Sequence, residues 1–321
     1  MKKVKTLKNI YFLFPALFIT FVFWGCSQQA YYKDSKFLMG TVVEISCPDK
    51  QAIDIAFEEI KRIDELLSKF NPESEVSKLN TTGKLQVGED LLYVLKKAKE
   101  FYLSSSGSFD VTIGPLADIW KKAIKDNQLP SKDQIEKAKA LVGFDKVYID
   151  EASSTVTFLK EGIEIDLGAI AAGYAVDRAI KKVLDLGIDS CLINIGGDLY
   201  CLGDNKGEPW QVVIQHPRNK NELIDILRIT DRAVSTSGDY EQKFILNDKR
   251  YSHIIDPRTG YPADTGVVSA TVTAPYCLNA DVLATTIFVL GKEKGLALVN
   301  YYDNTKAVIY TEEEISVFDN F

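Results

Sequence analysis

The sequence predicts an α+β fold in which mixed or antiparallel sheets pack against helices in a single globular body, residues 37–321. From residue 144 onward, short segments rich in β-branched residues recur, as expected for strands. Only two helical segments, at about residues 170–186 and 279–290, interrupt them. Turn residues rather than helices often join neighbouring strands, which favours antiparallel or mixed pairing over a strict βαβ order. No linker divides the chain after residue 36.

The first half of the body alternates between the two kinds of element. The run MGTVVEIS, residues 39–46, has the β-branched composition of a strand. Apolar residues then recur at helical spacing, and Pro72 breaks the pattern. Helices are predicted, in chain order, at residues 53–67, at about 90–104, and from a capping box at Ser131 and Gln134 to near Gly143.

The second half contains most of the predicted strands. They are residues 144–150, 154–159, 163–167, 190–195, 210–216, 224–229, 266–274 and 306–310. Residues 233–242, AVSTSGDYEQ, combine small hydroxyl side chains with a glycine and are predicted to form a hydroxyl-rich loop.

The amino terminus has the pattern of an export signal. Four lysines and no acid precede a long apolar run that stops at Gly25 and Cys26. A small residue before Cys26 and polar residues after it are typical of a bacterial lipoprotein, and a plain membrane anchor is the alternative. We therefore expect residues 1–25 to be a signal peptide, and residues 26–36 to be a lipidated tether that holds the protein on a bacterial membrane, facing the periplasm.

The composition excludes one class of partner. Removing residues 1–25 takes away four lysines and no acid, so the net charge changes from −7 to −11. A body this acidic is a poor nucleic-acid binder. The remaining cysteines, at 47, 191, 201 and 277, form neither a CxxC pair nor a zinc pattern. We expect these cysteines to be buried free thiols, and a single disulfide between two of them is the alternative.

Two segments contain side chains suited to proton and metal chemistry. His253 is one of only two histidines in the chain, and its ordinary pKa lies near neutrality, so it suits a general base or a structural hydrogen bond. Asp281 and Thr285 lie four residues apart and so share one face of a helix. Their hard oxygens suit Mg²⁺, although a capping Asp with a back-bonded Thr explains the same spacing.

Two glycine-containing segments follow predicted strands. The helix that opens at Gly168–Asp177, GAIAAGYAVD, either binds a phosphate at its start or packs closely against a neighbouring element, and taken alone it fits packing better. The turn NIGGD ends at Asp198, which is suited to a ribose hydroxyl or to capping the turn.

Together these segments resemble the ApbE family of FAD:protein FMN transferases. The matching motifs, in chain order, are MGT at 39–41, FDVTIGPL at 109–116, DLGAIAAGYAVD at 166–177, NIGGD at 194–198, AVSTSGDY at 233–240, HIIDPRTGYP at 253–262 and NADVLAT at 279–285. Any one of them is weak alone, but seven in the family's order are specific.

The resemblance implies an ApbE-like, T-fold-related body and a Mg²⁺-dependent enzyme. Such an enzyme binds FAD, attaches FMN through a phosphoester to a threonine of an acceptor protein, and releases AMP. It further implies that His253 is the catalytic base, and that Asp281, Thr285 and the backbone carbonyl of Ala169 hold the metal. The residues implied for the FAD cleft are Met39, Asp110, Gly173, Asp198, Ser237, Gly238, Asp239, Tyr240 and Arg258.

The chain departs from the family at one position. The family commonly has lysine in GAIAKGYA, where this chain has Ala172. Either a neighbouring cation, Arg258 or Lys181, compensates for the missing lysine, or the active site is slower or differently tuned. The alternative functions are FAD hydrolysis to FMN and AMP, and noncatalytic flavin binding by a lipoprotein. The resemblance implies acceptors in exported or membrane-bound redox complexes of the Rnf or sodium-pumping NADH:quinone reductase type.

Overall fold

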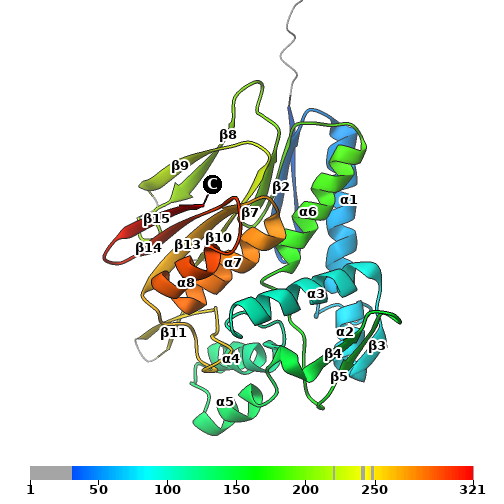
Figure 1. Ribbon diagram of the computed structural model, residues 1–321, viewed down its shortest axis with the longest axis vertical. Helices are drawn as coiled ribbons and strands as arrows, with labels where there is room; N and C mark the ends of the chain where they lie inside the picture. Colours follow the sequence, from blue (N-terminus) through cyan, green and yellow to red (C-terminus); the bar gives the residue numbers. More distant parts are fainter. Residues whose placement is uncertain (1–30, 220, 240–242, 247–248, 321) are drawn as a thin grey trace, which may run out of the picture.

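The protein is built on one large antiparallel sheet (Figure 1). The computed structural model describes residues 31–219, 221–239, 243–246 and 249–320. In spatial order the eight strands are β1 (Tyr32–Leu38), β2 (Thr41–Cys47), β6 (Cys191–Ile195), β7 (Asp198–Leu202), β10 (Arg232–Gly238), β13 (Val267–Ala274), β14 (Thr305–Thr311) and β15 (Ile315–Asn320). Every neighbouring pair in the sheet is antiparallel. The α+β prediction is therefore confirmed, and of the two predicted kinds of sheet, mixed or antiparallel, the large sheet is antiparallel.

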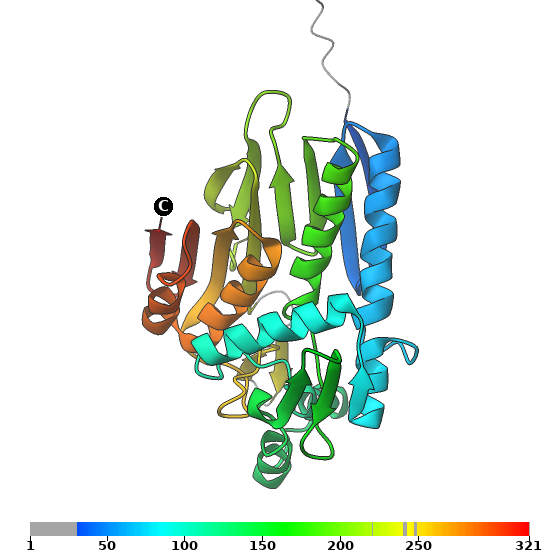
Figure 2. The same cartoon turned by 45° about the vertical axis from the view of Figure 1, so that its right-hand side comes forward.

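Helices cover one face of this sheet (Figures 1 and 2). They are α1 (Lys50–Leu67), α6 (Ala171–Asp185), α7 (Cys277–Leu290) and α8 (Lys292–Val299). The first of these buries the apolar stripe from Ile53 to Leu67 that the sequence predicted. Helix α7 is apolar on nearly all sides and almost completely buried, because it packs between α6, α8 and the strands β10 and β13.

A smaller unit lies beyond the ends of α1 and α6. It contains α2 (Glu75–Thr82), β3 (Lys84–Gln86), α3 (Glu89–Ser104), α4 (Gly114–Asp126), α5 (Lys132–Lys139), a short 3₁₀ turn (Phe144–Lys146), β4 (Val147–Asp150) and β5 (Thr155–Phe158). The capping box at α5 is confirmed, since Ser131 and Gln134 bond each other's backbone N–H. Two further hairpins, β8 (Trp210–Gln215) with β9 (Leu223–Ile229) and β11 (Lys243–Leu246) with β12 (Lys249–Ser252), complete the fold.

Three predictions about local structure need correction. Residues 163–167 are not a strand: Glu164 forms one isolated bridge with Ile113, and the backbone of Ile165 bonds the side chain of Asn80 instead of a strand. Residues 233–238 are not a loop but most of strand β10, because their small side chains fit beneath α7. Strand β1 begins at Tyr32, so the end of the predicted 26–36 tether belongs to the fold.

The described residues leave the export prediction open. Residues 1–25 and Cys26 lie outside them. No helix within the described ranges is long and apolar enough to cross a membrane. The four cysteines that the structure describes are buried free thiols, as expected.

Candidate functional site

The first turn of α6 meets the start of α7 at a close backbone contact. A Cβ on Gly173 would lie 2.6 Å from the carbonyl oxygen of Cys277, so glycine is needed here. The Gly173 N–H donates to Asp281 Oδ2 over 3.2 Å, and Asp281 is buried. The carboxylate therefore lies at the positive end of α6, which stabilises its charge. Close packing explains this glycine without a bound phosphate.

The same contact leaves a backbone oxygen out of the helical pattern. In a regular α-helix the N–H of Gly173 bonds the carbonyl of Ala169, but here that N–H binds Asp281. Among the backbone hydrogen bonds of the described ranges, none ends on the Ala169 oxygen. Ala169 is half-buried. A carboxylate and a carbonyl without a helical partner thus lie at one helix start.

Two serines of strand β10 contact the predicted site residues Asp198 and Thr285. Ser235 and Ser237 are two positions apart, so their side chains share one face of the strand. Ser237 Oγ lies 3.1 Å from Thr285 Oγ1, one helical turn after Asp281. Ser235 donates to Asp198 Oδ1 over 2.5 Å. Burial raises the pKa of Asp198 to about 6, although the bond from Ser235 acts in the opposite direction.

Met39 lies in the tight turn between β1 and β2, with a left-handed φ of 52°. Its N–H donates to Asp64 Oδ2 over 2.9 Å. Met39, Gly168 and Ala171 line a pocket of about 190 Å³, and Phe70, whose side chain is 72% exposed, borders it. The fold therefore brings the MGT turn and the loop before α6 together.

Lys69 is the cation of this pocket, and sequence reasoning did not single it out. Its Nζ lies 2.8 Å from Asp118 Oδ1 and 3.0 Å from Asp166 Oδ2, and its side chain is only 11% exposed. Asp166 also accepts the Gly168 N–H over 2.9 Å. Burial acts against the charged form, but Asp166 and Asp118 outweigh it and raise the pKa of Lys69. Lys69 thus holds the loop that carries the Ala169 carbonyl, and no sequence pattern marks a lysine as buried.

The two cations expected to compensate for Ala172 are paired elsewhere. Ala172 is the second residue of α6 and is half-buried. The Arg258 guanidinium donates to both oxygens of Asp256, over 2.9 and 2.8 Å. Lys181 lies more than two turns further along α6 and pairs with a residue of the same helix. Lys69 is the cation that the structure places beside the loop leading into α6.

The candidate base lies between β12 and the turn at residues 256–260. His253 is half-buried, and the next residue, Ile254, is anchored in the core with its N–H bonded to Ser252 Oγ over 3.1 Å. Ser252 and Asp239 line one pocket of about 410 Å³. The His253 segment therefore lies beside the end of β10 that carries Ser237.

The other histidine is structural. His216 Nδ1 accepts the N–H groups of Arg218 and Asn219, and its Nε2 lies 3.1 Å from the hydroxyl of Tyr310. Arg218 in turn pairs with both oxygens of Asp239, over 2.6 and 2.9 Å. Arg218 is a second residue that sequence reasoning missed, because its partner Asp239 follows strand β10 of the large sheet, whereas Arg218 follows β8 of a separate hairpin.

Two other predicted residues, Gly238 and Asp110, lie in the described part of the chain, and a third does not. Gly238 ends β10 opposite Ser269, and Tyr240 lies outside the described residues. Asp110 is buried and accepts the N–H groups of Thr112 and Phe144, over 2.8 and 3.2 Å. Burial raises its pKa to about 6. Asp110 thus holds the loop before α4, and its expected contact with FAD stays a prediction.

The oxygens at the α6–α7 contact suit one kind of metal. No group of three or more His, Cys, Asp or Glu side chains in the described ranges could hold a metal ion. The available donors are instead the Asp281 carboxylate, the Thr285 hydroxyl and the Ala169 carbonyl. All three are hard oxygens, which fit Mg²⁺ and do not fit a thiolate- or imidazole-bound metal.

Known proteins resemble this chain in both sequence and fold. The sequence profile of the ApbE family matches residues 39–309. The chain belongs to the ApbE family. Both the family and the fold class predicted from the sequence are thereby confirmed.

Several ApbE relatives match over nearly the whole chain. An FAD:protein FMN transferase of Klebsiella pneumoniae is 32% identical, and the match covers 89% of this chain and 91% of that protein. One from Treponema pallidum is 29% identical over 88% of this chain and 85% of the relative. The crystal structure of the ApbE protein from Thermotoga maritima superposes with a TM-score of 0.83 at 32% identity, covering 91% and 97% of the two chains. The flavin transferase ApbE from Vibrio cholerae gives 0.79 at 27% identity, with the same coverage.

Proposed function

We propose that this ApbE protein is an enzyme that transfers FMN from FAD to a threonine hydroxyl of an acceptor protein, with Mg²⁺, and releases AMP. Relatives named FAD:protein FMN transferase cover most of the chain, which supports the reaction class. The observation that carries the proposal is the bond from the Gly173 N–H to Asp281, one helical turn before Thr285, which leaves the Ala169 carbonyl without its helical partner at the start of α6.

These three oxygens are the proposed metal ligands. Asp281 is buried and held by the Gly173 N–H, so its position does not depend on the ion. Thr285 is oriented by Ser237. Mg²⁺ at this place would neutralise charge on the pyrophosphate oxygens of FAD while AMP departs.

The proposed transfer needs one general base. The acceptor's threonine hydroxyl attacks the phosphorus of the FMN half of FAD, and the bond from that phosphorus to the bridging oxygen breaks. AMP leaves with the bridging oxygen, and the hydroxyl proton passes to the imidazole of His253. A threonine hydroxyl is a weak nucleophile near neutral pH, which is why a base is required. His253 is one of only two histidines, and its segment lies beside the end of β10 that carries Ser237, which supports it for the role.

The flavin is proposed to bind near the turn that contains Met39. Phe70 borders the pocket there and exposes 72% of its side chain, so it offers an aromatic surface to a planar ring. Asp198, which hydrogen-bonds Ser235 on the neighbouring strand, and Asp239, at the end of that strand, are the proposed polar contacts further along the cleft.

The deciding experiment incubates the full chain with FAD, Mg²⁺ and a threonine-containing acceptor protein. Acceptor mass and AMP are then measured, with parallel reactions that lack the acceptor or contain EDTA. An FMN mass increment that EDTA abolishes supports the proposal. AMP release without an adduct would identify an FAD pyrophosphatase, and FAD binding with neither product would identify a flavin-binding protein.

We further propose that the protein works outside the cytoplasm, anchored to a bacterial membrane through a lipidated Cys26. The basic and apolar residues 1–25 and the small Gly25 support this location. Its acceptors would then be exported or membrane-bound redox subunits, including those of Rnf-type and sodium-pumping NADH:quinone reductase complexes. Mass spectrometry of the mature amino terminus tests the anchor, since an unmodified residue 26 would contradict it.

A further inference from the structure

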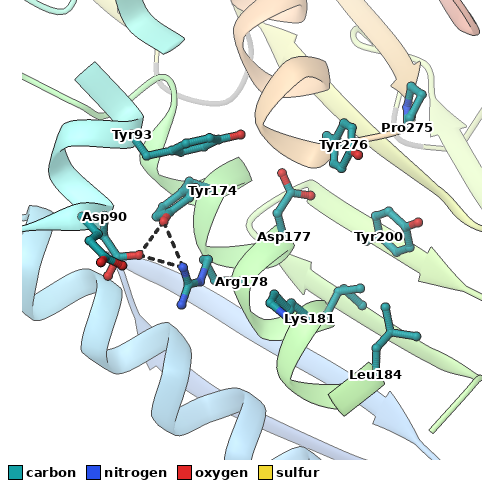
Figure 3. A pocket seen from close by; sticks show the side chains of 12 residues that line it. Asp90, Tyr93, Tyr174, Asp177, Arg178, Lys181, Leu184, Tyr200, Pro275 and Tyr276 are labelled. Carbon is teal, nitrogen blue, oxygen red and sulfur yellow. Dashed lines mark hydrogen bonds and ion pairs between the residues drawn. The ribbon is translucent and has the colours of Figure 1, made fainter. Parts of the chain in front are cut away.

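A third pocket, of about 480 Å³, opens between α3, α6, β7 and the start of α7 (Figure 3). It shares no lining residue with the pockets beside Met39 and Asp239. Its volume lies within the range of small-molecule binding sites. Four tyrosines contribute to its lining: Tyr93, Tyr174, Tyr200 and Tyr276.

The tyrosines form two walls. Tyr93 and Tyr174 stack on one side, with ring centroids 5.5 Å apart and an interplanar angle of 30°. Tyr200 and Tyr276 lie on the other side, together with Pro275 (Figure 3). Tyr93 and Tyr276 expose 47% and 63% of their surface. Large aromatic side chains that face a shared hollow are typical of a ligand site.

A carboxylate lies between the two walls. Asp177 points into the space that separates Tyr93 from Tyr276 (Figure 3). It accepts the N–H groups of Cys277 and Leu278, over 2.7 and 3.0 Å, and so caps the start of α7. Both donors are backbone N–H groups, so these bonds place no positive side chain beside the carboxylate. Burial raises the pKa of Asp177 to about 7, against the effect of these two hydrogen bonds.

The positive side chains of this pocket have other partners. Arg178 pairs with Asp90 over 3.0 Å. Lys181, which is 66% exposed, pairs with Asp185 over 3.2 Å. Within the part of the chain that the structure describes, no ion pair joins either of them, or any other cation, to Asp177. Arg178 also lies over the Tyr174 ring, with its Cζ 6.0 Å from the ring centroid. Among the described residues, the pocket therefore presents a carboxyl group and three rings that have no cation over them, those of Tyr93, Tyr200 and Tyr276.

We propose that this pocket binds a small organic ammonium ion, with its charged head between the tyrosine rings and Asp177. Ammonium groups are attracted to the faces of aromatic rings, and the attraction strengthens when a site is shielded from water. A carboxylate at the base of the pocket adds charge complementarity that a neutral ligand of the same shape cannot use. This site is separate from the proposed flavin cleft, so the proposal does not depend on whether the protein transfers FMN.

A pair of isosteric probes tests the proposal on the full chain by isothermal titration calorimetry at about pH 8, where Asp177 is mostly ionised. Choline carries a quaternary ammonium group, and 3,3-dimethylbutan-1-ol has the same shape without the charge. We expect choline to bind at least about tenfold more tightly than the alcohol. Equal affinities, or no choline binding at about 10 mM, where even a weak site would be filled, would overturn it.

Tyrosine variants locate the binding. Tyr276→Ala and Tyr93→Ala remove exposed rings from opposite walls, and each should weaken choline binding about fivefold. Tyr301→Ala is the matched control, because Tyr301 is 83% exposed and lies outside the pocket. Asp177→Asn should also weaken choline binding, with circular dichroism checking that α7 still forms. Choline affinity that is unchanged in both tyrosine variants would refute the assignment.

Discussion

Replacing Lys69 with methionine removes a buried charge from the site while keeping most of the side-chain length. Lys69 Nζ contacts Asp118 and Asp166 at 2.8 and 3.0 Å, with only 11% of its side chain exposed. A third carboxyl group, that of Glu164, is close by, and burial together with Asp118 raises its pKa. The variant therefore leaves several acidic groups near one another without the cation that two of them contact.

The expected loss of stability follows from this geometry. Removing one partner of a buried ion pair costs about 3–5 kcal/mol. Asp118 is 52% exposed and Asp166 only 23%, so solvent screens one of the two contacts, and we expect about 3 kcal/mol, the lower end of that range.

The sign of the pH dependence is also determined. Burial raises the pKa of Glu164 and Lys69 acts to lower it, so without Lys69 the folded variant binds a proton on Glu164 more tightly than the folded parent does. Its stability deficit should therefore shrink as the pH falls from about 8 to about 5.

Urea unfolding at both pH values measures the effect, and FMN transfer measured in parallel reports on the loop before α6. Lys181→Met is the matched control: that lysine is 66% exposed, and its loss should cost less than about 0.5 kcal/mol. A Lys69→Met deficit below about 1 kcal/mol, or one that does not change with pH, would show that Lys69 does not hold these carboxylates.

The other predictions concern the α6–α7 contact and the base. His253→Ala should spare FAD binding but lower FMN transfer by a factor of about 10² or more, and near-parental AMP release with acceptor would remove it from the mechanism. Asp281→Asn should reduce activity and Mg²⁺ dependence together, so an unchanged Mg²⁺ titration would contradict its role as a ligand. Gly173→Ala places a methyl group 2.6 Å from the Cys277 carbonyl and should cost about 1–3 kcal/mol in urea unfolding; parental stability would argue against the close contact. Ala172→Lys restores the family's cation, and an unchanged transfer rate would show that the missing lysine does not affect FMN transfer.

Local patterns predicted much of the fold because they depend on neighbours in the chain. The capping box at Ser131 and the buried stripe of α1 were both found where the sequence placed them. Residues 233–238 were misread as a loop because serine and glycine favour turns on their own. In the fold they pair with β7 and β13 beneath α7, and this tertiary setting outweighs their local preference.

The sequence by itself determined the family and the helical spacing that puts Asp281 and Thr285 on one face. Through the family motifs, it also indicated that the glycine-containing helix start at 168–177 belongs to the functional site. Only the tertiary structure showed that the Gly173 N–H binds Asp281, 108 residues away, and so releases the Ala169 carbonyl. Lys69 likewise became part of the site only in three dimensions. Contacts between distant segments depend on how helices pack against one another, and no pattern of neighbouring residues encodes them.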